Sequence, residues 1–315
     1  MIEFNHVSKT FGTHKAVNDL NLNFREGSFS VLIGTSGSGK STTLKMINRL
    51  VEHDSGTIRF AGEEIRSLPV LELRRRMGYA IQSIGLFPHW TVAQNIATVP
   101  QLQKWSRARI ADRTEELMAL LGLEPGLRDR YPHQLSGGQQ QRVGVARALA
   151  ADPQVLLMDE PFGALDPVTR SALQQEISRI HRLLGRTIML VTHDIDEALH
   201  LAEHLVLMDG GEVVQQGAPL EMLTSPVNEF VQAFFGRSEL GVRLLSLKRV
   251  ADYVRRDERL AGEALAQEIT LRDALSVFVE RGCEVLPVAD PQGVPCGTLH
   301  FRDLLTRTPP HEPTL

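Results

Sequence analysis

The sequence has little cysteine, no long apolar run and no large excess of charge of one sign. Its two cysteines, Cys283 and Cys296, match no metal-ligand spacing, so we expect reduced thiols packed in the fold. No stretch approaches the roughly 20 apolar residues that cross a bilayer, so no membrane-spanning helix is expected. The N-terminal residues lack the basic and apolar regions of a signal peptide, and we therefore expect a cytosolic chain.

The charge pattern gives no electrostatic footprint for nucleic acid. The formal net charge is −4, and the basic residues are dispersed along the chain. Residues 74–76, three arginines in a row, form the only compact basic run. Because this run is too short for a nucleic-acid tract, we favour a solvated helix face, and we expect no nucleic-acid partner.

A glycine- and serine-rich loop is the most informative feature that is present. It follows the apolar run 29–33 and precedes a helix-forming segment. In that order, the backbone N–H groups of small residues can turn inward onto phosphates, and the start of the helix adds the positive end of its dipole. An ordinary turn is the alternative. We predict a nucleoside triphosphate site formed by Gly34, Thr35, Ser36, Gly37, Ser38, Gly39, Lys40, Ser41 and Thr42.

Two residues of this loop have side chains suited to particular parts of the nucleotide. Lys40 is expected to reach the β and γ phosphates, and the Ser41 hydroxyl to ligand Mg²⁺. The motif therefore implies a nucleoside triphosphate and Mg²⁺ as cofactors.

A second motif is the apolar run 155–158, which ends in the adjacent carboxylates Asp159 and Glu160. The run is typical of a buried parallel strand. Asp159 is predicted to hold Mg²⁺ through water, and Glu160 to orient or deprotonate the water that attacks the γ phosphate. The alternative is a strand that leaves the core into an exposed acidic turn.

The 315 residues, 42% of them hydrophobic, predict two domains or one large domain with an appendage. Apolar residues at 20, 22 and 24 alternate with polar ones, which predicts an antiparallel strand. The largely apolar segment 187–192 predicts a buried strand, and the segment 205–215, with Asp-Gly-Gly at its centre, predicts a hairpin. Asp166 fits the N-cap of a helix over 167–184, which Gly185 ends. The chain is predicted to have an α/β nucleotide-binding fold.

Two further regions differ in pattern from this α/β core. Residues 82–147 carry few strand signals and predict a helical insertion with a helix near 109–121. We expect a domain boundary near Gly236, followed by a linker or degenerate segment over 237–264, a small unit of helix and strands over 265–306 and a disordered tail over 307–315.

A third motif completes the set. Residues 135–139, Leu-Ser-Gly-Gly-Gln, precede a helix expected over 140–150 and lie shortly before the acidic strand. With the phosphate loop and the Asp-Glu pair, residues 1–236 resemble the ATPase subunits of ABC transporters. The resemblance implies an ABC ATPase core with a mixed sheet, an antiparallel β subdomain and a helical insertion. Ser136, Gly137, Gly138 and Gln139 at a helix N-terminus would form a second anion site.

That second site implies a partner subunit, because the chain already has its own phosphate loop. Residues 135–139 correspond to the signature motif of the family. The resemblance implies that two copies pair head to tail and trap two ATP molecules, each between the phosphate loop of one subunit and the signature motif of the other. The loop 164–166, with Asp166, matches the segment that contacts the opposite subunit.

Further residues match the family by position. Phe11 resembles the aromatic residue that stacks on adenine, although it could instead belong to the core. Gln82 matches the glutamine that joins Mg²⁺ and the attacking water to the transmembrane subunit. His193 matches the histidine that contacts the γ phosphate and holds Glu160, although a satisfied strand-end histidine is the alternative.

Residues 34–50 and 82–92 look like the corresponding segments of the ATPase subunits of quaternary amine osmoprotectant importers. That resemblance makes glycine betaine the leading cargo, with choline or carnitine next. Residues 265–306 resemble one CBS module, a small αβ unit that often occurs in pairs in that branch, and the resemblance makes 237–264 either a linker or a degenerate CBS-like segment. The resemblance implies transmembrane permease subunits, an extracytoplasmic substrate-binding protein as an indirect partner, and a peripheral position on the cytoplasmic face of the cell membrane.

The sequence also allows other functions. One is an ABC importer of another small solute, such as an amino acid, and another is a soluble ABC ATPase outside transport, although the chain has a single set of motifs. A zinc-peptidase pattern at 200–204 is rejected, because Asp194 and Glu197 resemble a capping box and the apolar stripe of that helix leaves the histidines on its solvated side.

Overall fold

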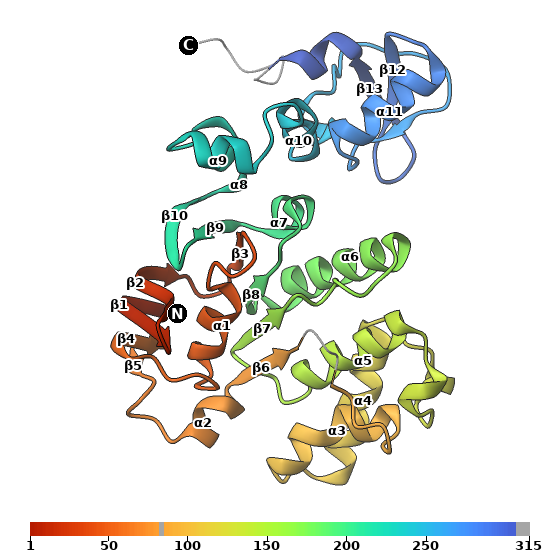
Figure 1. Ribbon diagram of the computed structural model, residues 1–315. Helices are drawn as coiled ribbons and strands as arrows, with labels where there is room; N and C mark the ends of the chain where they lie inside the picture. The colour runs from red at the N-terminus through yellow and green to blue at the C-terminus, as the bar shows by residue number, and fades with distance from the viewer. Residues whose placement is uncertain (82–84, 307–315) are drawn as a thin grey trace. The chain divides into compact units, whose positions relative to one another are not determined.

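The computed structural model describes residues 1–81 and 85–306, which form two compact units divided between Ala218 and Pro219 (Figure 1). The first unit contains two sheets and the second unit one, and each unit has its own apolar core. No helix in the described part of the chain is both long and apolar enough to cross a bilayer.

The first unit begins with a four-stranded antiparallel sheet in the order β2-β1-β4-β5. The expected antiparallel strand is confirmed as β2, in which Leu20, Leu22 and Phe24 are buried while the residues between them are exposed. This alternation places one face of the sheet on the core. The strands are β1 (Ile2–Phe11), β2 (His14–Phe24), β4 (Ser55–Phe60) and β5 (Glu63–Glu64).

The second sheet of this unit has six strands in the order β10-β9-β3-β8-β7-β6. Its strands are parallel except for β10, which pairs antiparallel with β9 as the expected hairpin. Because β3, β7 and β8 are buried along their whole length, they read as continuous apolar runs. The strands are β3 (Phe29–Gly34), β6 (Met77–Ala80), β7 (Val155–Asp159), β8 (Thr187–Val191), β9 (His204–Asp209) and β10 (Glu212–Gly217).

This order places β3 beside β8 and β8 beside β7. Parallel strands end at the same edge, so the loops that follow β3, β7 and β8 are neighbours. Those loops carry the phosphate-binding segment, Glu160 and His193.

Helix α6 (Pro167–Leu184) has the termini that the sequence predicted. The Asp166 carboxylate accepts bonds from the backbone N–H groups of Val168 and Thr169, and Gly185 ends the helix at φ 59°. Helices that contact strands of this unit include α1 (Lys40–Ile47), α2 (Val70–Arg75) and α7 (Ile195–Leu201).

A helical region lies between β6 and β7, as predicted, and forms the separate group of helices below the sheet in Figure 1. Its α5 starts at Gly137 rather than at Gln140, because Ser136 accepts the N–H of Gln139 and caps the helix. The region consists of α3 (Val92–Leu102), α4 (Arg107–Leu120), the 3₁₀ turns η1 (Pro125–Leu127) and η2 (Pro132–Gln134), and α5 (Gly137–Leu149).

The second unit starts earlier than the boundary expected near Gly236. The physical reason is packing: Leu220 and Met222 line the same cavity as Leu240 and Leu244, so the helices before Gly236 belong with those after it. These helices are α8 (Pro219–Thr224), α9 (Glu229–Phe234) and α10 (Leu240–Ser246).

The predicted strands and helix near the C-terminus are confirmed. A three-stranded sheet has the order β11-β12-β13, with α11 next to it. Segment 237–264 is not a loose linker, since Val250, Tyr253 and Val254 are buried in the same core as Phe278 and Leu286. The elements are η3 (Val250–Asp252), β11 (Leu265–Ala266), α11 (Leu271–Arg281), β12 (Val285–Ala289), β13 (Pro295–His300) and η4 (Phe301–Leu305).

Both cysteines are free thiols that pack partly against this core, as expected. The CBS-like character of 265–306 stays a prediction, and the predicted tail 307–315 lies outside the described residues.

Candidate functional site

The loop between β3 and α1 requires glycine at two positions. Gly34 has φ 155°, and a Cβ there would lie 1.9 Å from the carbonyl oxygen of Met208. Gly39 has φ 94°, and a Cβ there would lie 2.3 Å from the carbonyl oxygen of Ala16. Any larger residue would collide with backbone that cannot move cheaply, so the close approach of these segments depends on glycine.

Lys40 holds the loop in shape. Its ammonium group donates to the carbonyl oxygens of Gly34 (3.0 Å) and Thr35 (2.7 Å) and to the hydroxyl of Ser38 (3.1 Å). Burial lowers the pKa of Lys40, while the nearby carboxylates of Glu160 and Asp159 act to raise it. The positive charge is thus partly desolvated, which strengthens its attraction for an anion.

The carboxylate of Asp159, at the end of β7, lies against the start of α1. Its Oδ1 accepts the Ser41 hydroxyl at 2.7 Å, and its Oδ2 lies 3.7 Å from Lys45 Nζ and 3.5 Å from the Tyr79 hydroxyl. Burial and the adjacent Asp159 charge raise the pKa of Tyr79, which therefore stays a neutral donor.

Sequence reasoning missed Lys45 and Tyr79. Lys45 carried a usable signal, because it follows Ser41 by four residues on α1 and so lies on the same helix face. Tyr79 reaches Asp159 from the neighbouring strand β6, and this pairing is visible only once the strand order is known.

Hydroxyl and carboxylate oxygens are the ligands that Mg²⁺ prefers, so Ser41 and Asp159 fit the predicted metal. Among the described residues, no group of three or more histidine, cysteine, aspartate and glutamate side chains forms a metal cage.

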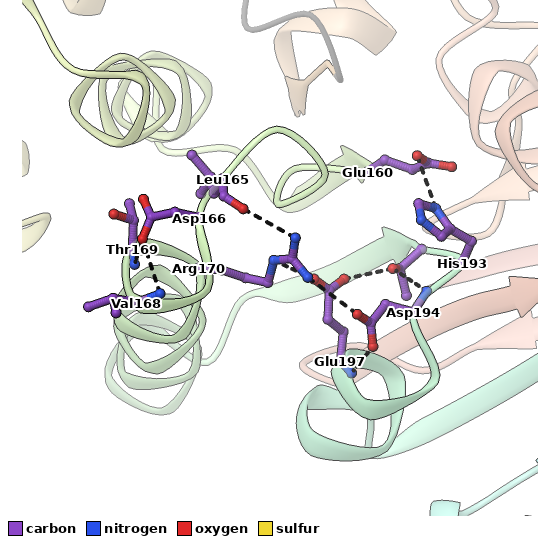
Figure 2. A network of polar contacts seen from close by, with 10 residues as sticks. Glu160, Leu165, Asp166, Val168, Thr169, Arg170, His193, Asp194 and Glu197 are labelled. Atoms are coloured by element: carbon purple, nitrogen blue, oxygen red, sulfur yellow. Dashed lines mark hydrogen bonds and ion pairs between the residues drawn. The ribbon is translucent and has the colours of Figure 1, made fainter.

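Glu160 and His193 are paired at the same edge of the sheet. The His193 Nδ1 lies 3.2 Å from the Glu160 Oε2, as Figure 2 shows. Glu160 has φ 47°, a left-handed conformation that is strained for a residue with a side chain, and its N–H donates to the carbonyl of Val191. The alternative of an exposed acidic turn is wrong for Glu160, whose side chain is 21% exposed.

An open cavity of about 660 Å³ brings these groups together. It joins predicted residues from four separated parts of the chain, namely Phe11, the loop 36–42, Glu160 and His193, and it also includes His14 and Ala16, which no sequence signal had indicated. Its lining residues are Phe11, His14, Ala16, Ser36, Gly37, Ser38, Gly39, Lys40, Ser41, Thr42, Glu160 and His193.

Three predicted loop or metal residues do not line the cavity. Gly34 and Thr35 instead present carbonyl oxygens to Lys40, and Asp159 lies behind Ser41. They support the residues that face the open space.

Phe11 is 49% exposed, so the alternative that it belongs to the core is wrong. The ring lines the cavity, and the Lys9 ammonium lies 5.2 Å from its centroid. An exposed ring at the edge of a phosphate site is available for stacking on a base.

The signature motif does not line the cavity of its own chain. Ser136 and Gln139 form a capping box, in which the Gln139 side chain accepts the Ser136 N–H at 3.0 Å. A Cβ on Gly137 would meet nothing within 4 Å, so its surroundings are open.

Gly138 has a packing role that the sequence did not indicate. It is buried, and a Cβ there would lie 2.3 Å from the Thr169 Cγ2 on α6. The glycine lets α5 and α6 approach closely. Its predicted contact with nucleotide stays a prediction.

Two remaining expectations concern Gln82 and the zinc-peptidase pattern. Gln82 lies outside the described residues. His200 lies on α7 but His204 begins strand β9, so the two histidines do not share a helix face. The predicted cap of α7 is confirmed for Asp194, whereas Glu197 bonds to Thr192 rather than back to the cap.

Comparison with known proteins agrees with this geometry. The ABC transporter family matches residues 17–163. The glycine betaine uptake system ATP-binding protein YehX of Escherichia coli is 87% identical over 97% of this chain and 99% of its own length. The glycine betaine/carnitine/choline transport ATP-binding protein OpuCA of Bacillus subtilis is 48% identical over 93% of this chain and 77% of its own.

Solved structures show the same fold. The dimeric structure of MJ0796, a bacterial ABC transporter cassette, matches with a TM-score of 0.64 and 34% identity, covering 70% of this chain and 99% of that one. The fold, the phosphate loop, the acidic strand end and the sequence relationship all agree: the chain belongs to the ATP-binding subunits of ABC transporters.

Proposed function

We propose that this chain hydrolyses ATP to drive uptake of glycine betaine, or a related quaternary amine, by an ABC importer. The observation that carries the proposal is the single cavity in which the phosphate loop, Glu160 and His193 meet. The cargo is supported by the relatives from Escherichia coli and Bacillus subtilis, both named for glycine betaine.

In this proposal the loop amides and Lys40 bind the β and γ phosphates. The adenine ring stacks on Phe11 at the exposed rim. Glu160 accepts a proton from the attacking water, and His193, held 3.2 Å from that carboxylate, orients it and contacts the γ phosphate.

Mg²⁺ would be held by Ser41 and, through water, by Asp159, with Gln82 as a further predicted ligand. The metal supplies charge neutralisation on the phosphate oxygens. The chain's own contribution is to hold the Asp159 carboxylate in place, because Ser41, Tyr79 and Lys45 all contact it.

The functional unit in this proposal is a head-to-tail dimer. The signature motif Ser136–Gln139 is absent from the lining of its own cavity, and relatives form dimers. Ser136, Gly137 and Gln139 of the partner subunit would then close the ATP site from the opposite side, with Asp166 near the interface.

The partners in transport are a transmembrane permease and an extracytoplasmic substrate-binding protein. The chain would attach to the permease at the cytoplasmic face of the membrane through the helical insertion around 82–90, of which 85–90 lie within the described residues. In this position, closure of the ATP dimer is transmitted to the permease.

The test is ATP-dependent uptake of labelled glycine betaine into proteoliposomes that contain this chain, its co-purifying permease and the binding protein. We expect uptake that excess choline or carnitine reduces and that an amino-acid mixture leaves unchanged. The matched complex with Glu160→Gln controls for leakage. Uptake of an amino acid instead of glycine betaine would show that the proposed cargo is wrong. If the chain hydrolyses ATP but assembles with no permease, an ATPase outside transport would be favoured.

A further inference from the structure

Arg170, on the first turns of α6, reaches out to the loop that precedes its own helix. Its Nη2 donates to the carbonyl oxygen of Leu165 at 3.2 Å (Figure 2). That loop runs from Glu160 to Asp166 and is closed by two turn bonds, from the N–H of Gly163 to the carbonyl of Glu160 and from the N–H of Leu165 to the carbonyl of Phe162. Arg170 thus bonds the far end of the loop that begins with Glu160.

The same guanidinium group reaches a second loop, the turn between β8 and α7. Its Nη1 lies 3.4 Å from the Asp194 Oδ2, and its Nε lies 3.8 Å from the Glu197 Oε1. Asp194 directly follows His193 in the chain. A planar guanidinium group suits this task, because its donors point in fixed directions toward several acceptors at once.

The turn is held in shape by a chain of hydrogen bonds that starts at Glu197. Its carboxylate accepts the Thr192 hydroxyl at 2.6 Å, and that hydroxyl accepts the N–H of Asp194 at 3.0 Å. The Asp194 carboxylate in turn accepts the N–H of Glu197 at 3.1 Å. The bonds therefore fix the backbone on both sides of His193.

We infer that Arg170 is a positioning residue for ATP hydrolysis, which sets the position of His193 relative to Glu160 by tying together the two loops that carry them. Arg170 is not among the residues that line the proposed ATP cavity of its own chain, so we expect it to act without direct contact with the nucleotide or the water. Its effect is expected in the chemical step rather than in ATP binding.

The ion pair between Arg170 and Glu197 involves a buried carboxylate. The Glu197 side chain is 7% exposed, and burial raises its pKa, while Arg170 and the Thr192 hydroxyl act to lower it. Removal of Arg170 leaves a buried carboxylate without its cation, and such a group turns toward water or takes up a proton. Either change disturbs the turn that holds His193.

The first test is the ATPase activity of the reconstituted complex with Arg170→Ala. We expect kcat to fall about 10- to 100-fold, as for a small misplacement of catalytic groups, with the Kd for ATP within about twofold of wild type. Arg170→Lys keeps the charge without the fork and should recover part of kcat. Arg182→Ala, an exposed arginine on the same helix, is the matched control and should behave as wild type.

The second test separates positioning from general destabilisation. If Arg170 acts through His193, Arg170→Ala should cost less than about twofold in kcat when introduced into a His193→Ala complex. Multiplicative losses in the double variant, or a Kd for ATP that rises in parallel with the loss of kcat, would overturn the inference.

A third variant keeps the test usable if Arg170→Ala does not fold. Glu197→Gln has the same shape and removes the charge that faces Arg170. It should lower kcat without changing the Kd for ATP, with a cost that disappears in the His193→Ala background. Wild-type kcat in both Glu197→Gln and Arg170→Lys would contradict the inference.

Discussion

The imidazole of His193 lies 3.2 Å from the carboxylate of Glu160, although the two residues come from different strands. The neighbouring strands β7 and β8 end at the same edge of the sheet, and the N–H of Glu160 donates to the last residue of β8. The contact therefore depends on strand order, and it places the base that we propose, Glu160, beside His193 at one wall of the proposed ATP cavity.

Glu160→Gln should separate binding from hydrolysis. The amide keeps the size of the side chain but cannot accept the proton, so kcat should fall by roughly 10²- to 10⁴-fold while ATP still binds and the closed dimer accumulates. Steady-state ATPase assays and size-exclusion chromatography with ATP measure both effects. Glu72→Gln, an exposed glutamate on α2, is the control. Near-normal turnover would remove Glu160 from the role of base.

Phe11→Ala should weaken nucleotide binding. A stacked base contributes about 1–3 kcal/mol, so the Kd for ATP should rise roughly 5- to 100-fold. Phe11→Tyr keeps the ring and should bind as wild type. The measurement is equilibrium titration with ATP, and equal affinities in the alanine and tyrosine variants would show that the ring does not stack.

Gly138→Ala should destabilise the first unit by about 1–3 kcal/mol, because its Cβ would collide with Thr169. Thr169→Ala removes the colliding methyl group, so the double variant should lie close to Thr169→Ala alone. Gly137→Ala, whose Cβ has open space, should stay within about 0.5 kcal/mol of wild type. Denaturant unfolding measures all four chains, and additive losses at 138 and 169 would contradict the packing role.

His53 should make stability depend on pH. Burial, with the nearby Arg66 charge, lowers the pKa of His53 from its ordinary value of 6.5. The stability that buried, neutral His53 contributes is therefore complete above about pH 6.5. It is lost as the pH falls toward the lower pKa that His53 has in the folded protein, because in this range mainly the unfolded chain takes up the proton.

The measurement is the free energy of unfolding between pH 7.5 and pH 5 for the wild type and for His53→Leu. The variant should lose less stability on acidification than the wild type. His133→Leu, an exposed histidine, should follow the wild type. Parallel pH curves for the wild type and His53→Leu would refute the assignment.

Local sequence signals predicted the parts of the fold that local chemistry determines. The ends of α6 follow from the Asp166 cap and Gly185, and the phosphate loop follows from glycines whose neighbours allow no Cβ. The apolar runs predicted β7 and β8, since strands buried on both faces have no alternation.

Features that depend on contacts between distant segments were not predictable from local signals. The division at 218 arises because residues before 236 pack on α10, and no composition shift marks it. Arg170 reads as an ordinary helix arginine, because its partner Asp194 lies on a turn that follows the next strand. Gly138 reads as a ligand-binding glycine until the approach of α6 is seen.

We propose that ATP hydrolysis by this chain is coupled to uptake of a quaternary amine. The most direct measurement is ATP hydrolysis by the complex of this chain and its permease in liposomes, with binding protein either empty or loaded with glycine betaine. The account predicts that loaded binding protein stimulates hydrolysis and that Glu160→Gln abolishes the stimulated rate. Hydrolysis that proceeds at the same rate with empty and loaded protein would contradict the coupling.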